Sequence, residues 1–237
     1  MARAAVPGRL TWRKAALRAI RQETPTARTL VFDVDGGWPG HVPGQHVDVR
    51  LTAPDGYQAQ RSYSIASASG LEITVQRLDG GEVSPYLTDI YDISWPVEVR
   101  GPVGGWFVWR PADPAPVQLI AGGSGVVPLM SMVRARGEVG SKTPFKLLYS
   151  VRTPEDTIYA DELRRRARDD GGLDVQYIHT RVRNKRIGVA DVHTHAWPKD
   201  FAPSVFVCGP TGFVETVADI LVALGHDASR IRTERYG

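Results

Sequence analysis

The stretch VQLIAGGSGVVPLM, residues 117–130, decides the fold of this chain. Its apolar run 117–121 predicts a buried strand, the glycines predict a tight turn, and residues 126–136 have the apolar spacing of a helix. A strand that runs directly into a helix begins a crossover connection between parallel strands. Further elements of the same kind are expected as a strand at 145–150, a helix at 159–168, strands at 173–178 and 205–208, and a helix at 212–224. This alternation predicts a parallel α/β sheet.

The segment RPADPAP, residues 110–116, holds three prolines, which stiffen the chain and interrupt any hydrogen-bonded ladder. We therefore divide the chain here into one domain at 1–112 and a second at 113–237. The first half has short β-forming segments between Gly and Pro breaks, at 29–34, 46–51 and 71–75, and one segment of helical character at 82–90. This spacing predicts a small antiparallel barrel ahead of the α/β domain.

Composition excludes several classes of protein. With 237 residues, 42% of them hydrophobic and 23% charged, the chain is a globular protein and not a disordered one. No apolar stretch approaches the roughly 18 residues of a membrane helix, and the N-terminus lacks the apolar core of a signal peptide, so we expect a cytoplasmic protein without a membrane partner. The single cysteine, Cys208, excludes a disulfide within the chain and an iron–sulfur cluster held by four of its thiolates. We expect no metal site. The six histidines include only one close pair, His193 and His195, and residues two apart point to opposite sides of a strand and share no face of a helix.

Basic residues cluster in two runs. The chain has 29 basic and 26 acidic residues, a formal net charge of +3, which does not require nucleic acid as a partner. The runs are Arg164, Arg165, Arg166 and Arg168, and Arg181, Arg183, Lys185 and Arg186. Each run is either a solvated face or a docking surface for an acidic partner or a phosphate.

The turn formed by Gly122, Gly123 and Gly125 lies where a nucleotide is expected. Glycines let the backbone approach a pyrophosphate, and the free N–H groups and dipole of the following helix favour an anion. Glycines also serve packing at such turns, so the turn alone leaves both interpretations open. Pro128 stands where the GxGxxG fingerprint has its last glycine, so the ordinary dinucleotide fingerprint is absent.

Two further segments carry polar chemistry. The hydrophobic run 205–208 ends at Cys208, at the edge of a parallel sheet where ligands bind, although a lone cysteine is also a common buried residue. In RSYSIAS, residues 61–67, the guanidinium of Arg61 suits a pyrophosphate and the ring of Tyr63 suits stacking on a flat heterocycle. An ordinary strand with alternating polar residues is the alternative.

Five short motifs follow one another in an order that resembles the ferredoxin–NADP reductase family. They are R-x-Y-S from Arg61, G-G-x-V-S from Gly80, G-P-x-G from Gly101, G-G-x-G-x-x-P from Gly122 and C-G-P from Cys208. The resemblance covers the chain from about residue 10 to residue 237. It implies an N-terminal six-stranded antiparallel Greek-key barrel that binds FAD, and a C-terminal parallel α/β domain that binds a nicotinamide nucleotide, with the flavin in the cleft between them.

The resemblance also implies roles for individual residues. Arg61 contacts the FAD pyrophosphate, Tyr63 stacks on the isoalloxazine, and Ser64 forms a hydrogen bond near N5. The other residues expected to bind FAD are Ser62, Gly80, Gly81, Val83 and Ser84. Those expected to bind the nicotinamide nucleotide are Gly122, Gly123, Gly125, Pro128, Arg152, Arg181, Gly209 and Pro210.

Four residues are expected at the reaction centre: Ser64, Cys208, Glu234 and Tyr236. The last two are similar to the family's closing glutamate and aromatic, although Gly237 follows here, and a frayed polar tail is the alternative. Trp106, in the turn 104–107, lies either near the flavin or in the core, and we favour the core.

The resemblance implies an FAD-dependent NAD(P)H oxidoreductase that passes single electrons to a separate acceptor, such as a ferredoxin, a flavodoxin or an oxygenase component. Arg152 and Arg181 favour NADPH, because a 2′-phosphate is bound by arginines, while NADH, and FMN in place of FAD, remain open. We expect a monomer. The alternatives are a reductase of small acceptors (flavin, quinone or metal chelate) and a non-catalytic flavin- or nucleotide-binding regulatory module on the same fold.

Overall fold

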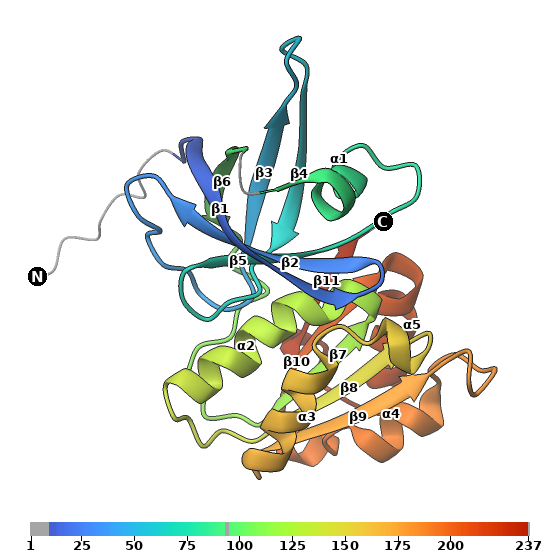
Figure 1. Cartoon of the computed structure of the whole chain (residues 1–237). Coiled ribbons are helices and arrows are strands. Elements are labelled where there is room, and N and C mark those ends of the chain that lie inside the picture. The colour runs from blue at the N-terminus through green and yellow to red at the C-terminus, as the bar shows by residue number, and fades with distance from the viewer. Residues whose placement is uncertain (1–9, 93–94, 237) are drawn as a thin grey trace, which may run out of the picture.

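The computed structural model describes residues 10–92 and 95–236, which form two packed sheets with their helices (Figure 1). Six antiparallel strands make the first sheet, in the order β4-β3-β6-β1-β2-β5. Their bounds are β1 (Arg13–Thr24), β2 (Ala27–Val34), β3 (His46–Thr52), β4 (Gln58–Ser64), β5 (Leu71–Gln76) and β6 (Val97–Val103). A bridge between Ile65 and Ile73 brings the exit of β4 beside β5, so the two edge strands meet and the sheet closes as a barrel.

Apolar side chains that alternate along these strands fill the barrel, among them Leu30, Phe32, Val47 and Val49. Two short helical turns, α1 (Val83–Pro85) and the π-helical η1 (Tyr86–Ile90), cover one end and add Val83 and Leu87 to this core. The segment expected to be helical at 82–90 is therefore helical.

Five parallel strands make the second sheet, in the order β11-β10-β7-β8-β9. Their bounds are β7 (Val117–Gly122), β8 (Phe145–Val151), β9 (Leu173–His179), β10 (Ser204–Pro210) and β11 (Ile231–Tyr236). The helices are α2 (Val126–Glu138), α3 (Ala160–Asp169), α4 (Val189–His195) and α5 (Thr211–Ala223). Short 3-10 turns are η2 (Gly123–Gly125), η3 (Pro154–Asp156), η4 (Lys199–Phe201) and η5 (Ala228–Arg230). The expected barrel and parallel α/β domain are both confirmed.

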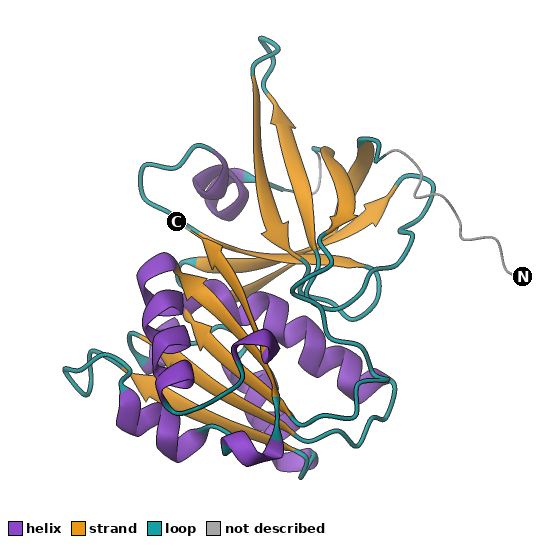
Figure 2. Cartoon of the chain, turned by 180° about the vertical axis from the view of Figure 1, so that it is seen from behind, coloured by secondary structure: helices purple, strands orange, loops and turns teal. Residues whose placement is uncertain are grey.

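Helices cover both faces of the parallel sheet (Figure 2). Along β7, Leu119 packs with residues of α2 and α3, whereas Ile120 packs with residues of α4 and α5. This alternation gives the sheet a hydrophobic core on each side. No helix in the described part of the chain is both long and apolar enough to cross a bilayer.

The connection after β6 packs against the α/β half. Phe107 contacts Phe206 edge to face with ring centroids 5.4 Å apart, and Trp109 contacts Phe145 in the same way at 5.0 Å. The expectation that Trp106 is buried was wrong, because 64% of its surface is exposed. The three residues that follow it, Phe107, Val108 and Trp109, are buried instead. The division at residue 112 remains a prediction.

Candidate functional site

A cleft of about 1190 Å³ opens at the carboxyl ends of the parallel strands. Its α/β wall includes Gly122 and Gly123 at the end of β7, Arg152 directly after β8, and Pro210 at the end of β10. Its barrel wall includes Gln76, Arg77 and Leu78. The carboxyl edge of an open α/β sheet is the usual site for ligands, and this cleft has room for a large one.

The glycine turn before α2 faces the cleft on one side and packs closely against other residues on the opposite side. Gly123 has a φ of +56°, which favours glycine. A Cβ on Gly122 would lie 2.7 Å from the ring of Phe213, and a Cβ on Gly125 would overlap the carbonyl oxygen of Cys208. Gly122 and Gly123 therefore line the cleft, while Gly125 and Pro128 are buried behind it and are not among its lining residues. Packing therefore requires glycine at 122 and 125, and the nucleotide interpretation of Gly122 and Gly123, which line the cleft, remains a prediction.

The last two strands set the position of Cys208. In the parallel register, Cys208 of β10 lies opposite Glu234 of β11, and Gly209 and Pro210 lie opposite Arg235 and Tyr236. Only 2% of Cys208 is exposed. Burial, and to a lesser degree the charge of Glu234, raise the pKa of the Cys208 thiol well above its ordinary value. The thiol is therefore neutral at physiological pH.

Glu234 joins the two sheets. The Ser64 hydroxyl at the end of β4 donates a hydrogen bond of 3.4 Å to Glu234 Oε1, across 170 residues of sequence. Burial raises the pKa of the Glu234 carboxyl to about 7, and the hydrogen bond from Ser64 opposes this shift only in part. The carboxyl can therefore hold or release a proton near neutral pH.

Tyr236 is fixed against the glycine turn. Its hydroxyl donates to the Gly122 carbonyl at 2.6 Å and accepts from the Gly125 N–H at 3.3 Å. Burial raises the pKa of this hydroxyl to about 12. Because Tyr236 ends a strand and lines the cleft, the interpretation of residues 233–236 as a frayed tail was wrong. Gly237 lies outside the described residues.

On the barrel side, β4 presents three different environments. Tyr63 is partly buried against the barrel core, and burial raises its pKa to about 12. The side chain of Arg61 is 57% exposed and lies 3.8 Å from Glu82. Ser62, which is exposed, donates a hydrogen bond of 2.6 Å to Asp48 of the neighbouring strand β3.

The Gly80–Ser84 segment is an open loop braced from within. Gly80 has a φ of +77° and free space around it, whereas Val83 is buried in the barrel core. Ser84 Oγ accepts a hydrogen bond of 3.1 Å from the Leu78 N–H. The backbone of Gly80 is thus accessible, and the Ser84 side chain shapes the loop.

One of the two arginines expected to bind the nucleotide lines the cleft, and the other does not. Arg152 lines the cleft and lies 3.5 Å from Asp156. Arg181 is not among the lining residues and contacts Arg152 through its backbone N–H at 3.0 Å. Arg186 lines the cleft instead, and the only signal for it in the sequence is its place in the second basic run.

Arg77 of the barrel is a further lining residue that the sequence did not single out. It is held by Asp79 at 3.1 Å and Asp89 at 2.9 Å. Its place directly after a β-forming segment is the only sequence signal.

The donors in the structure fit a flavin and a nicotinamide nucleotide. Tyr63, Ser64 and Arg61 supply an aromatic ring, a hydroxyl and a guanidinium at one end of the barrel, beside the open backbone of Gly80. Gly122 and Gly123 supply an accessible backbone at the head of α2, and Arg152 and Arg186 supply cations on the same wall. These are the groups that a pyrophosphate, a flat ring system and a further phosphate require.

Comparisons with known proteins agree with this arrangement. Residues 14–108 match the family model of the oxidoreductase FAD-binding domain, and residues 119–219 match that of the oxidoreductase NAD-binding domain. The chain is 33% identical over 241 residues to ferredoxin–NADP reductase B of Sorangium cellulosum (strain So ce56), covering 94% of this chain and 97% of that protein.

Other relatives are longer than this chain. It is 31% identical over 244 residues to the glycine betaine monooxygenase reductase subunit of Chromohalobacter salexigens, covering 92% of this chain and 62% of that protein. Among solved structures, the FAD/NAD-binding domain of a nitric oxide dioxygenase from Vibrio cholerae superposes with a TM-score of 0.83 at 24% identity, covering 95% of this chain and 98% of that one. This last likeness concerns the fold alone.

Proposed function

The chain belongs to the ferredoxin–NADP reductase family and is an FAD-dependent NAD(P)H oxidoreductase, and from this premise we propose that it takes hydride from NADPH and delivers single electrons to a separate protein. FAD, when bound, supplies the chemistry that links a two-electron donor to a one-electron acceptor. The residues of the chain then have to orient the reactants and manage protons.

Four residues would form the reaction centre. Ser64 and Glu234 would place a hydroxyl and a titratable carboxyl at the flavin edge, since they already contact each other. Cys208 would offer a neutral, apolar surface beside the nicotinamide, because its thiol is buried. Tyr236, hydrogen-bonded to the Gly122 carbonyl, would lie where the nicotinamide ring has to enter to reach the flavin.

FAD would be held by β4 and the Gly80–Ser84 loop. Arg61, which is half exposed, would neutralise the pyrophosphate, and Tyr63 would stack on the flavin. Gly80 and Gly81 would offer backbone N–H groups. Ser62, Val83 and Ser84 would act mainly by supporting these elements, because their side chains already contact the barrel or the loop.

NADPH would lie in the cleft, with its pyrophosphate at Gly122 and Gly123 and its 2′-phosphate near Arg152 and Arg186. Arg181 would support Arg152 through the backbone, and Gly125 and Pro128 would hold the turn in place. Gly209 and Pro210 would shape the wall after β10. The cleft is lined by three arginines and by four carboxylates, which are Asp79, Asp156, Glu215 and Asp219. The two arginines on the α/β wall, Arg152 and Arg186, support NADPH over NADH.

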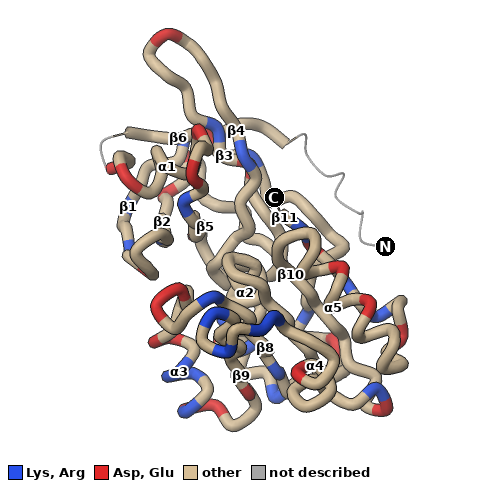
Figure 3. The backbone as a smooth tube through the Cα atoms, turned by 90° about the vertical axis from the view of Figure 1, so that its right-hand side faces the viewer, with Lys and Arg blue, Asp and Glu red and all other residues tan. Residues whose placement is uncertain are grey.

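The electron acceptor is proposed to be a ferredoxin, a flavodoxin or an oxygenase component, in the cytoplasm, with this chain as a monomer. The names of two relatives, a ferredoxin–NADP reductase and a monooxygenase reductase subunit, support this class of acceptor. Both basic and acidic residues lie along α3 (Figure 3), with acidic residues in its first turn and the basic run after them. Arg164, Arg166 and Arg168 of that helix each pair with a carboxylate of the same segment, so the first basic run is better explained as a solvated face than as a docking surface.

The contact between Ser64 and Glu234 carries this proposal, because it joins the end of the flavin strand to the end of the nucleotide domain. The test is an anaerobic visible spectrum of the purified protein, titrated separately with NADPH and with NADH. We expect a flavin absorption band at about 450 nm, and we expect NADPH to bleach it at a lower concentration than NADH does. A band that neither nucleotide bleaches would contradict the proposal and favour a non-catalytic module.

A further inference from the structure

The barrel and the α/β half meet along a polar seam centred on α2. Ser131 Oγ donates to the Ser67 carbonyl at 2.7 Å, and Arg134 Nη1 donates to the Ala66 carbonyl at 2.9 Å. Ser131 is fully buried, and Arg134 is 9% exposed. Both carbonyls belong to the chain that leaves β4 directly after Ser64.

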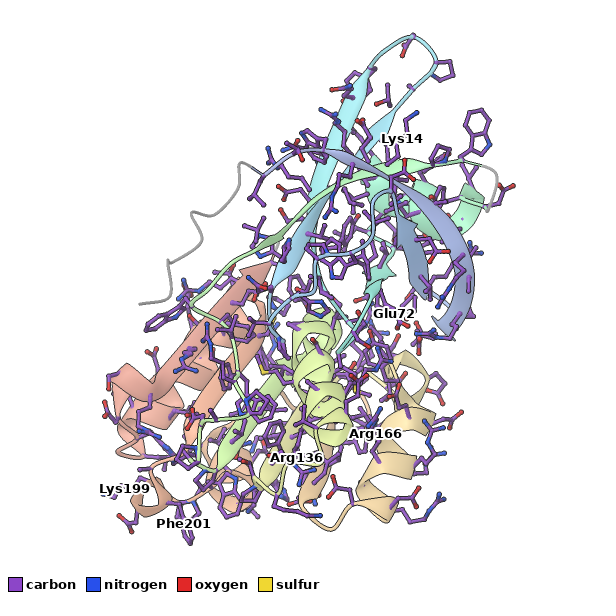
Figure 4. The ribbon with its side chains drawn as sticks, turned by 90° about the vertical axis from the view of Figure 1, so that its left-hand side faces the viewer. Lys14, Glu72, Arg136, Arg166, Lys199 and Phe201 are labelled. Atoms are coloured by element: carbon purple, nitrogen blue, oxygen red, sulfur yellow. The ribbon has the colours of Figure 1, made fainter. Side chains whose placement is uncertain are left out.

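Arg134 bonds to both halves of the molecule at once. Its Nε and Nη2 donate to the carboxylate of Glu162 on α3 at 3.1 and 2.6 Å. Its Nη1 reaches Glu72 on β5 of the barrel at 3.3 Å. Figure 4 labels Glu72 on the barrel and Arg166 on α3, both beside α2. A planar guanidinium can make these bonds together, whereas an ammonium group cannot reproduce their geometry.

Tyr159 reinforces the same seam. The guanidinium of Arg134 lies over its ring, 4.9 Å from the centroid. The Tyr159 hydroxyl is hydrogen-bonded to Thr74 of β5, which also bonds to Thr29 at 2.7 Å. Tyr159 has a φ of +61°, a conformation unusual for a residue with a side chain. Such a conformation persists only where surrounding contacts hold it.

The seam connects the two ends of the reaction centre through one rigid helix. α2 begins at the glycine turn, which faces the nucleotide cleft and packs against Cys208. Two turns later the same helix grips the carbonyls that follow Ser64. The distance between the flavin strand and the nicotinamide wall is therefore set by α2 and by the bonds of Arg134.

We propose that Arg134 is a positioning residue for hydride transfer: by bonding to Ala66 and Glu72 it fixes the angle between the two domains. The inference rests on the proposed function. Hydride transfer requires the reacting atoms to approach within about 3 to 3.5 Å, and a small change in the angle between domains moves them out of reach. The contacts proposed for the phosphates of NADPH, at Gly122, Gly123, Arg152 and Arg186, all lie on the α/β wall of the cleft. A change of the angle should therefore affect the approach of the nicotinamide to the flavin more than it affects NADPH binding.

The test compares two arginines that share one partner. In Arg134→Met, Glu162 keeps Arg166 at 2.8 Å and Glu72 keeps Arg21, so neither carboxylate loses its last cation. Arg166→Met removes the other bond to Glu162 and touches no barrel residue in the described contacts, which makes it the matched control. Stopped-flow reduction by NADPH and hydrogen exchange are measured on both flavin-loaded proteins.

We expect Arg134→Met to lower the limiting rate of flavin reduction by about tenfold or more, with the NADPH concentration at half saturation within about twofold of wild type. Arg166→Met stays within about twofold for both quantities. Amides of residues 64–67 and 72–74 exchange faster in Arg134→Met and not in Arg166→Met. Arg134→Lys keeps the positive charge but loses the planar guanidinium that bonds to several acceptors, and we expect its limiting rate to be as low as that of Arg134→Met.

Equal rates in the two variants would overturn the proposal, as would a uniform increase of exchange over the whole chain. If Arg134→Met does not fold, Glu72→Gln decides, because it weakens the bond from the barrel side with little change of shape. We expect it to lower the limiting rate by about threefold, and an unchanged rate overturns the proposal. Wild-type protein that NADPH fails to reduce would refute the proposed function instead, and the hydrogen exchange would still report on the seam.

Discussion

At the scale of single residues, the Glu234 carboxyl is the most informative group. Burial raises its pKa from 4.5 to about 7. A carboxyl whose pKa is higher in the folded state binds its proton more tightly there, so folding is favoured when the group is protonated in both states. The stabilising effect is complete below about pH 4.5 and is lost as pH rises through 7.

Glu234→Gln removes this dependence, because the amide stays neutral at every pH. The free energy of unfolding of the variant minus that of wild type is expected to increase by a value on the order of 2 kcal/mol as pH rises from 5 to 8. This value is reduced to allow for the partial exposure of the carboxyl. Urea unfolding at both pH values measures the difference. Asp35→Asn, at an exposed carboxyl, is the control for the change from acid to amide itself. A pH-independent difference between Glu234→Gln and wild type would refute the burial of this charge.

Cys208→Ala tests the second residue of the centre. The side chain is buried and lies opposite Glu234, so its truncation leaves space beside the proposed nicotinamide position. We expect single-turnover flavin reduction to slow by about tenfold, which corresponds to about 1.4 kcal/mol, while FAD remains bound. Cys208→Ser, which fills most of the space, should recover part of the rate. Unchanged rates in Cys208→Ala would remove Cys208 from the reaction centre.

At the scale of elements, the glycine turn explains why β7, η2 and β10 can approach so closely. Gly125→Ala places a Cβ against backbone atoms of Cys208 and Gly209, which cannot rotate away as a side chain could. We expect a loss of stability of about 2 to 3 kcal/mol. Gly105→Ala is the control, because a Cβ there meets nothing within 4 Å. Thermal or denaturant unfolding distinguishes them, and equal stability of the two variants would contradict this packing.

Elements with a clear periodicity could be predicted from sequence, and those whose character depends on a partner could not. The apolar strands β7, β8 and β10 and the helices α2 and α5 lie close to the predicted ranges. β11 reads Ile-Arg-Thr-Glu-Arg-Tyr, which looks like a polar tail until β10 supplies its hydrogen bonds. α4 is short and buries only Asp191 and Val192, so no helical stripe marks it.

The motifs of the site could be found in the sequence, but which of their residues line the cleft and which support it from behind could not. The structure brings Ser64 and Glu234 into contact and fixes Tyr236 against the glycine turn, while the roles that the resemblance implied for them remain predictions. No local pattern shows that Gly125 is needed for contact with Cys208, or that Arg186 reaches the cleft and Arg181 does not. These facts depend on contacts between segments that are far apart in sequence.

At the scale of the whole molecule, the two halves share a hydrophobic core. One cluster of buried residues contains Ala27 and Ala66 of the barrel half, Phe107 and Trp109 of the connection, and the α2 face of the parallel sheet. Together with the seam at Arg134, this continuity makes separate unfolding of either half costly, because each would expose the surface that the other covers.

We therefore expect one cooperative unfolding transition for both domains. Circular dichroism at about 222 nm follows the helices and so reports mainly the α/β half. The rise in fluorescence when the flavin is released reports the barrel. The two curves should coincide. Trp109→Ala should lower both midpoints together, with a loss of about 3 to 5 kcal/mol. Two separated midpoints in wild-type protein would show that the halves fold independently.

The burial of Cys208 has a practical side. The chain contains one cysteine, and 2% of it is exposed, with a thiol that resists deprotonation. Reagents that attack thiolates therefore leave the native protein unmodified. A cysteine introduced at any exposed position becomes a unique handle for a dye or for a gold electrode, and the native chain serves as its own blank.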